Sequence, residues 1–163
     1  MARLALAAGL ETRVVLIADP ATLTSDSSLF MRAYTRLGGK LCAVREPGEI
    51  TSAMRSLDEC AVIVDALLGT GVHGEVHGSL CHAMDEWPSL PTIAVDVPSG
   101  MNADTGEICG CCVPAKTTVT FQFAKKGFEN PEAQPYLGRL VIADIGIPEV
   151  CADDDAWHEL KTR

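Results

Sequence analysis

The sequence predicts an α/β protein, in which a mainly parallel central sheet is covered by helices on both faces. Short apolar runs alternate along the chain with segments of helical periodicity. These runs are apolar throughout and not at every second residue, which is typical of strands buried on both faces of a parallel sheet. Hydrophobic residues make up 47% of the 163 residues and aromatic residues 5%, so the core is expected to be mainly aliphatic.

The first elements have clear signals at their ends. An Ala-Leu run that ends at Gly9 predicts an N-terminal helix. Residues 12–18 are apolar and β-branched and stop at Asp19-Pro20, which predicts a strand. Residues 27–37 have apolar side chains near helical spacing, follow residues that can cap a helix, and end at Gly38-Gly39, which predicts the next helix.

The same alternation continues along the rest of the chain. Strands are predicted over 41–44, 61–64, 92–95, 117–121 and 139–143, helices over 49–57 and 78–87, and a capped terminal helix after Asp153-Asp-Asp155. Neither a repeat nor a low-complexity linker separates these elements. We therefore expect one domain over residues 1–148, followed by a tail over 149–163.

Charge and hydropathy exclude several classes of function. Thirteen Lys and Arg residues against 22 Asp and Glu residues give a net charge of −9. This balance argues against nonspecific binding to DNA, RNA or an anionic membrane, although it allows a local basic pocket. No segment approaches the ~18 apolar residues that a membrane-spanning helix needs.

Seven cysteines, an odd number, do not suggest a disulfide framework. Cys42, Cys60 and Cys81 stand singly among apolar or helix-like neighbours, as reduced thiols do, which favours the cytoplasm. The one cluster, Cys109-Gly-Cys-Cys112, offers two thiolates to a metal, but no second Cys/His pair lies at zinc-finger spacing. The segment His73-Gly-Glu-Val-His77 also departs from the zinc-protease pattern.

Three predicted strands end at an aspartate, namely Asp19, Asp65 and Asp96. Ligands of open parallel sheets bind outside the carboxyl ends of the strands. We therefore expect the three side chains to converge on one crevice. The alternative is that each aspartate only caps a turn.

The loops after Asp65 and Asp96 support a site at this edge. Residues 69–74 contain three glycines, which let the backbone bend sharply and turn its N–H groups toward an anion. Pro98 gives the second loop a rigid turn, which would hold the Ser99 hydroxyl or backbone carbonyls beside the Asp96 carboxylate. Oxygen ligands of this kind suit an alkali or alkaline-earth cation better than zinc.

A basic segment, Lys125-Lys126-Gly127, follows the strand predicted over 117–121. A cation at that strand end could meet the acidic side chains or a substrate phosphate. Two solvated lysines at a turn are an equally good interpretation.

Five segments between residues 63 and 148 share one order with a known family. They are Val64-Asp65-Ala-Leu-Leu-Gly69-Thr-Gly71, Val95-Asp96-Val-Pro-Ser-Gly100, Ala103-Asp104-Thr-Gly106, Thr118-Val-Thr-Phe121 with Lys125, and Asp144-Ile-Gly-Ile-Pro148. Together they resemble the NAD(P)H-hydrate epimerase family, also called the YjeF N-terminal domain. The resemblance implies a Rossmann-like domain, a three-layer αβα sandwich, that interconverts the two epimers of hydrated NADH or NADPH with a potassium ion in its site.

The resemblance also assigns roles to individual residues. Asp65 and Ser99 would bind potassium, and Asp96 would contact the substrate near the reacting ring, where we expect it to be the catalytic acid–base group. The substrate-binding residues implied, besides Asp96, are Gly69, Thr70, Gly71, Val72, His73, Gly74 and Glu75. A homodimer, and functional pairing with an ADP- or ATP-dependent hydrate dehydratase, are compatible with the resemblance.

One departure from the family leaves two interpretations open. Family members carry an additional helical segment and a Gly-Asn-Asn-Gly-Gly-Asp-Gly loop, whereas residues 1–9 match the helix just after that loop. The chain is therefore expected to be truncated at its N-terminus relative to the family. It is either an epimerase whose loop lies upstream or is otherwise supplied, or a degenerate member that serves as a non-catalytic binding or dimerisation module.

Overall fold

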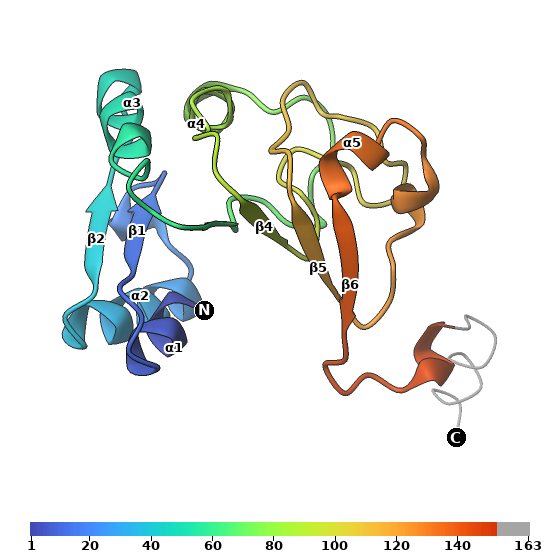
Figure 1. The fold of residues 1–163 in the computed structure, drawn as a ribbon, viewed down its shortest axis with the longest axis horizontal. Coiled ribbons are helices and arrows are strands. Elements are labelled where there is room, and N and C mark those ends of the chain that lie inside the picture. Colours follow the sequence, from blue (N-terminus) through green and yellow to red (C-terminus); the bar gives the residue numbers. More distant parts are fainter. Residues whose placement is uncertain (153–163) are drawn as a thin grey trace. The chain divides into compact units, whose positions relative to one another are not determined.

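The computed structural model describes residues 1–152, which form two compact units (Figure 1). The N-terminal unit consists of Met1–Ala61 and Val76–Leu90, and the C-terminal unit consists of Val62–Glu75 and the chain from Pro91 onward. Each unit contains its own parallel sheet. The terminal helix predicted after residues 153–155 lies outside the described residues.

The N-terminal unit is built on two parallel strands, β1 (Arg13–Leu16) and β2 (Lys40–Ala43), which Figure 1 shows side by side. Its helices are α1 (Ala2–Ala7), η1 (Pro20–Thr22), α2 (Ser25–Arg36), α3 (Pro47–Arg55) and α4 (Gly78–Asp85). The starts of α2 and α3 follow their sequences, because Thr24 caps α2 with its side chain and Glu46 forms a capping box with Glu49 at α3.

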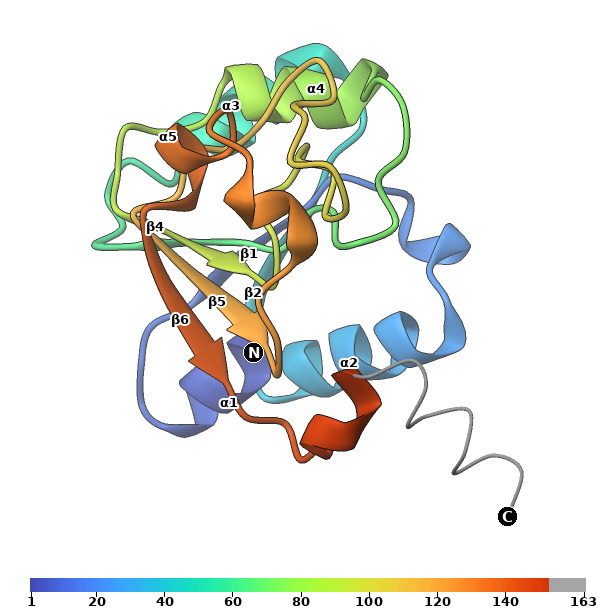
Figure 2. The ribbon, with the colours of Figure 1, turned by 90° about the vertical axis from the view of Figure 1, so that its right-hand side faces the viewer.

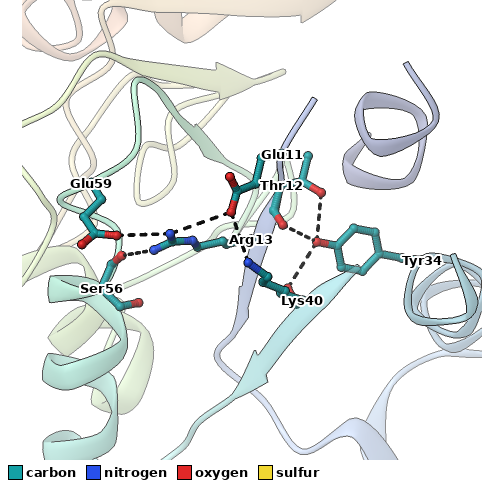
Figure 3. A network of polar contacts seen from close by, with 7 residues as sticks. All are labelled: Glu11, Thr12, Arg13, Tyr34, Lys40, Ser56 and Glu59. Atoms are coloured by element: carbon teal, nitrogen blue, oxygen red, sulfur yellow. Dashed lines mark hydrogen bonds and ion pairs between the residues drawn. The ribbon is translucent and has the colours of Figure 1, made fainter. Parts of the chain in front are cut away.

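One tyrosine connects α2 to both strands of this unit (Figure 3). The Tyr34 side chain is buried, and its hydroxyl lies 3.0 Å from the Thr12 carbonyl oxygen and 3.2 Å from that of Lys40. The ring fills the space where Gly39 lacks a Cβ. Ion pairs of Glu11 with Arg13 and Lys40 lie beside it but are largely exposed, so the buried tyrosine contributes most to this junction.

The C-terminal unit contains four parallel strands in the order β3 (Ile63–Asp65), β4 (Thr92–Val95), β5 (Thr117–Phe121) and β6 (Arg139–Ala143). Figure 2 shows the arrowheads of β4, β5 and β6 pointing the same way. Its short helices are η2 (Lys126–Glu129), α5 (Gln134–Leu137) and η3 (Glu149–Ala152). Because the strands are parallel, their carboxyl ends share one edge of the sheet.

The main core of this unit lies under the chain that follows β4. Val97 and Met101, from that segment, pack with Phe128 of η2 and Leu137 of α5. The segment is buried although it has no regular secondary structure. Its backbone groups are bonded to neighbouring segments, for example Val113 N–H to the Ser99 carbonyl and Cys109 N–H to the Gly100 carbonyl, so burial leaves them satisfied.

The α/β class and the parallel pairing are confirmed, and every predicted strand is present within a few residues of its expected bounds. Two features differ from the expectation. The strands form two sheets and not one. Strands β3, β5 and β6 are also not buried on both faces, since Val64, Phe121, Leu140 and Ile142 are between 37% and 54% exposed. Within residues 1–152, no helix is long and apolar enough to cross a membrane.

Candidate functional site

The carboxyl edge of the four-stranded sheet carries two of the predicted aspartates. Asp65 is the last residue of β3, and Asp96 directly follows β4. The two strands are neighbours, with Asp65 paired to Ala94 in the register. The amide of Asp96 also donates to the Val119 carbonyl of β5 at 2.8 Å, which ties the chain after β4 to the next strand. The sheet therefore brings both carboxyl groups to one edge, as expected.

Asp65 and Ser99 are in direct contact. The Ser99 hydroxyl donates to Asp65 Oδ1 at 2.6 Å, and the Ser99 amide donates to Asp65 Oδ2 at 2.8 Å. The Ser99 hydroxyl oxygen also accepts from the Leu68 amide at 2.9 Å and lies 3.2 Å from the Leu68 carbonyl. Both side chains are fully buried, so this cluster joins β3, its following loop and the turn after β4.

This contact corrects one expectation. The sequence suggested that the turn around Pro98 would hold Ser99 beside Asp96, but within the described residues the Ser99 side chain bonds to Asp65 and Leu68 instead. The reason is the left-handed backbone of Asp96, with φ at 69°, which turns the chain between the strand and the serine. Ser99 consequently faces the end of β3.

The cluster presents oxygen atoms of the kind that bind hard cations. Burial raises the pKa of Asp65 above its usual range, although the Ser99 hydroxyl, the Ser99 amide and the Leu67 amide counteract this effect. Its oxygens come from one carboxylate, one hydroxyl and the Leu68 carbonyl. Among residues 1–152, no three His, Cys, Asp or Glu side chains are grouped as for a metal ion. A set of hard oxygens with one negative charge fits an alkali or alkaline-earth cation better than zinc.

Asp96 is held by three donors that converge on one oxygen. Its Oδ1 accepts from the Thr120 hydroxyl and the Phe121 amide, each at 3.0 Å, and from Lys125 Nζ at 2.7 Å. Burial raises the pKa of Asp96, but the bonds from Lys125, Phe121 and Thr120 together hold it below its usual range. The group is therefore an ionised carboxylate at neutral pH.

The two lysines of the basic segment after β5 have different environments. Lys125 forms the ion pair with Asp96, with both side chains less than 20% exposed. Lys126 is exposed and belongs to η2. The sequence left two interpretations open for these lysines. For Lys125 the structure supports the first, in which a lysine contacts an acidic side chain.

The glycine-rich loop over residues 69–75 connects at both ends to the segment 99–112. Leu68 bonds to Ser99 just before the loop, and the Glu75 side chain packs against Gly110, where an added Cβ would lie 2.8 Å from Glu75 Cγ. Val72 is buried, whereas Gly69, Thr70, Gly71, His73, Gly74 and Glu75 are exposed. Of the three glycines only Gly74 has a positive φ, and open space surrounds all three. The exposed main chain leaves room for a ligand.

The third predicted aspartate has a local role. Asp19 Oδ1 accepts from the Ala21 amide at 2.9 Å and so caps η1. Its Oδ2 lies 2.8 Å from Arg45 in an exposed ion pair. Asp19 belongs to the N-terminal unit, where it caps a turn, as the alternative interpretation predicts.

Two groups of the site were given no role from the sequence. They are the Thr120 hydroxyl and the Leu68 carbonyl. Threonine at every second position of β5 marks its buried face and could have drawn attention to Thr120. Nothing in the sequence signals Leu68. Burial, together with the charge of Asp65 and the neighbouring thiols, raises the pKa of Cys112 to about 12, so this thiol is not a nucleophile at neutral pH.

Comparison with known proteins places these features in a family. The family described as "YjeF-related protein N-terminus" matches residues 1–127. The chain is 41% identical over 146 residues to the bifunctional NAD(P)H-hydrate repair enzyme Nnr of Pyrobaculum aerophilum, which covers 87% of this chain and 28% of that protein. It is 39% identical over 99 residues to the NAD(P)H-hydrate epimerase of Limosilactobacillus reuteri, which covers 59% of this chain and 47% of that protein.

A solved structure agrees with these sequence matches. The crystal structure of yeast ynu0 (YNL200c) has a TM-score of 0.65 and covers 90% of this chain and 60% of that chain. At 17% identity this likeness shows the fold alone. The chain spans only 28% of the length of the Pyrobaculum aerophilum enzyme. On the family match and the relatives, the chain belongs to the family of YjeF-related protein N-terminal domains.

Proposed function

We propose that this chain interconverts the R and S epimers of hydrated NADH and NADPH. The observation that carries the proposal is the ionised Asp96 carboxylate, held at the carboxyl edge of the sheet next to the Asp65–Ser99 cluster. Parallel sheets bind ligands at this edge. Relatives named NAD(P)H-hydrate epimerase and bifunctional NAD(P)H-hydrate repair enzyme support the assignment.

The chemistry needs one base at the hydrated carbon, which carries a hydroxyl next to the ring nitrogen. Asp96 accepts the hydroxyl proton as the C=O bond forms and the C–N bond breaks, and it passes this proton to the nitrogen, which becomes an N–H group. That nitrogen then attacks the other face of the carbonyl and loses its proton to Asp96, which returns it to the oxygen and so gives the other epimer. A carboxylate that is ionised at neutral pH is in the correct state to begin this cycle.

The remaining site residues bind and orient. We assign substrate binding to the loop of residues 69–75, whose main chain is exposed at Gly69, Thr70 and Gly71. Asp65 and Ser99 would hold potassium, and when bound this ion supplies positive charge beside an anionic nucleotide. The seven cysteines, all among the described residues, form no disulfide, which supports a cytoplasmic location. An ADP- or ATP-dependent hydrate dehydratase is the partner activity that would consume one epimer.

The variant Asp96→Asn tests the role of the carboxylate. The amide cannot accept the hydroxyl proton, so the epimerisation rate should fall by about 10²–10⁴-fold. The rate is measured by NMR or chiral chromatography on a purified epimer, after subtraction of the uncatalysed rate. Asp104→Asn is the matched control, because Asp104 is exposed in the same unit. Full activity of a folded Asp96→Asn protein would remove Asp96 from the mechanism.

The non-catalytic module is the competing proposal. It predicts that the folded wild-type chain leaves a pure epimer unchanged at the uncatalysed rate while it still binds hydrated NADH or a second copy of itself. Calorimetry with the hydrate and sedimentation of the free chain measure these two properties. Epimerisation by the wild-type chain would exclude this proposal.

A further inference from the structure

The carboxylate of Asp96 is bonded very unequally at its two oxygens. Three hydrogen-bond donors reach Oδ1, whereas within residues 1–152 no donor is set against Oδ2. A carboxylate oxygen with three donors has its lone pairs engaged, and the other oxygen remains available to accept. The side chain thus has one fixed oxygen and one open oxygen.

The three donors come from two different elements. Thr120 and the Phe121 amide belong to β5, which is the neighbour of the strand that carries Asp96. Lys125 directly precedes η2, four residues after the strand ends. These are also the polar and charged groups that set the pKa of Asp96, and Lys125 is the one charge among them.

The ammonium group of Lys125 is itself held by three acceptors. Besides the bond to Asp96, its Nζ donates to the carbonyls of Phe121 at 3.2 Å and Phe123 at 3.4 Å. An ammonium group has three hydrogens, so these three acceptors use all of them. Lys125 therefore has no donor left for a substrate phosphate, and its role must be exercised through Asp96.

We propose that Lys125 is a positioning residue, which fixes Oδ1 of Asp96 together with Thr120 and the Phe121 amide, so that Oδ2 is the atom that accepts the substrate proton. This inference rests on the proposed epimerase function. An unrestrained carboxylate rotates and presents either oxygen, whereas this one presents a single oxygen in one orientation. Misplacement of a reacting group by about 1 Å can cost up to about 10²-fold in rate.

The variant Lys125→Met keeps the length of the side chain but removes its charge and its donors. We expect kcat to fall, by up to about 10²-fold, with little change in KM, because Lys125 does not touch the substrate. The acid limb of the pH profile should move to higher pH, since the Lys125 ion pair keeps the pKa of Asp96 low. Lys125→Arg, which retains a cation, should restore part of the activity.

The matched control is Lys126→Met, which alters the exposed neighbour in η2 and should leave kcat and the pH profile unchanged. Two outcomes would overturn the proposal. An increase in KM at constant kcat would place Lys125 on the substrate, and an unchanged kcat in a folded Lys125→Met protein would show that it positions nothing.

The test also separates this inference from the proposed function. If the wild-type chain does not epimerise the hydrate, the proposed function fails, but the restraint on Asp96 can still be measured by NMR titration of its side-chain carboxyl carbon. In Lys125→Met the midpoint should move to higher pH, and in Lys126→Met it should stay at the wild-type value. An equal midpoint in all three proteins would overturn the positioning role.

Discussion

At the scale of single residues, Asp65 and Asp96 show how two strand-end carboxyl groups acquire opposite properties. Both lose water, which raises the pKa of each. Asp96 gains a cationic partner and ends below its usual pKa, whereas Asp65 has only neutral donors and ends above it. Among residues 1–152, no positive charge is set against the buried Asp65 carboxyl group, which is consistent with a cation site.

The raised pKa of Asp65 makes the stability of the cation-free protein depend on pH. The folded chain binds a proton at Asp65 more tightly than the unfolded chain, for which the pKa is about 3.9. As pH rises from that value through the folded pKa, the free energy of unfolding decreases, and the decrease persists at neutral pH. Ionised Asp65 consequently opposes folding unless a cation is bound.

Asp65→Asn should make the cation-free protein more stable at neutral pH. The amide oxygen can accept from the Ser99 amide and its NH₂ group can donate to the Ser99 hydroxyl, which then turns to the Leu68 carbonyl at 3.2 Å. The gain should shrink as pH falls toward about 3.9. Urea unfolding without potassium, with Asp104→Asn as the control, measures it. Equal losses of stability at all pH values would contradict the assigned pKa shift.

Sequence reasoning could place residues at the ends of strands but could not orient them. Asp65 and Asp96 follow apolar runs, which is enough to predict the shared edge. The left-handed backbone of Asp96 directs Ser99 toward Asp65. The sequence gives no signal for this turn, because the residue there is an aspartate and not the glycine that usually marks a left-handed backbone. Asp19 ends a similar run, yet its partners are Ala21 and Arg45, which only the folded unit reveals.

At the scale of elements, the position of η2 determines where Lys125 lies. Gly106 and Gly127 pack backbone against backbone, and a Cβ added at Gly106 would lie 2.1 Å from the Gly127 carbonyl oxygen. The Gly127 amide also donates to the Ala103 carbonyl at 2.8 Å. This close approach holds η2 against residues 103–106, and Lys125 directly precedes that helix.

Gly106→Ala should therefore reduce both stability and activity. The new methyl group meets backbone, at a φ of +75° that L residues rarely adopt, so the free energy of unfolding should fall by about 1–3 kcal/mol or more. Gly38→Ala is the control, because its φ is +85° but open space surrounds it, and it should cost only about 1 kcal/mol. Thermal unfolding and kcat are measured for both, and equal effects would exclude the packing argument.

Elements with strong periodicity were predictable and short ones were not. The strands β4, β5 and β6 have the predicted bounds, because a β-branched run bounded by turn residues defines both where a strand begins and where it ends. The helices η2 and α5, each four residues long, were missed. A segment of that length has no measurable helical period, and its place is set by contacts such as the Gly106–Gly127 approach.

At the scale of the whole molecule, composition predicted the class but not the pairing of strands. Apolar runs that alternate with helices indicate parallel strands, and the strand pairs within residues 1–152 are all parallel. An apolar run does not indicate which other strand it pairs with, so the grouping into a two-stranded and a four-stranded sheet could not be predicted from these runs. Net charge, in contrast, belongs to the whole chain and acts on any ligand that approaches it.

A net charge of −9 opposes the approach of an anionic nucleotide, because the field extends over about a Debye length of 10 Å at 0.1 M salt. We therefore expect kcat/KM for the hydrates to rise several-fold with ionic strength. The rise should be steeper for hydrated NADPH, which carries an additional phosphate. Kinetics at constant potassium with added tetramethylammonium chloride measure both slopes. A decrease with salt would contradict this prediction and show that local basic residues, and not the net charge, dominate the field at the site.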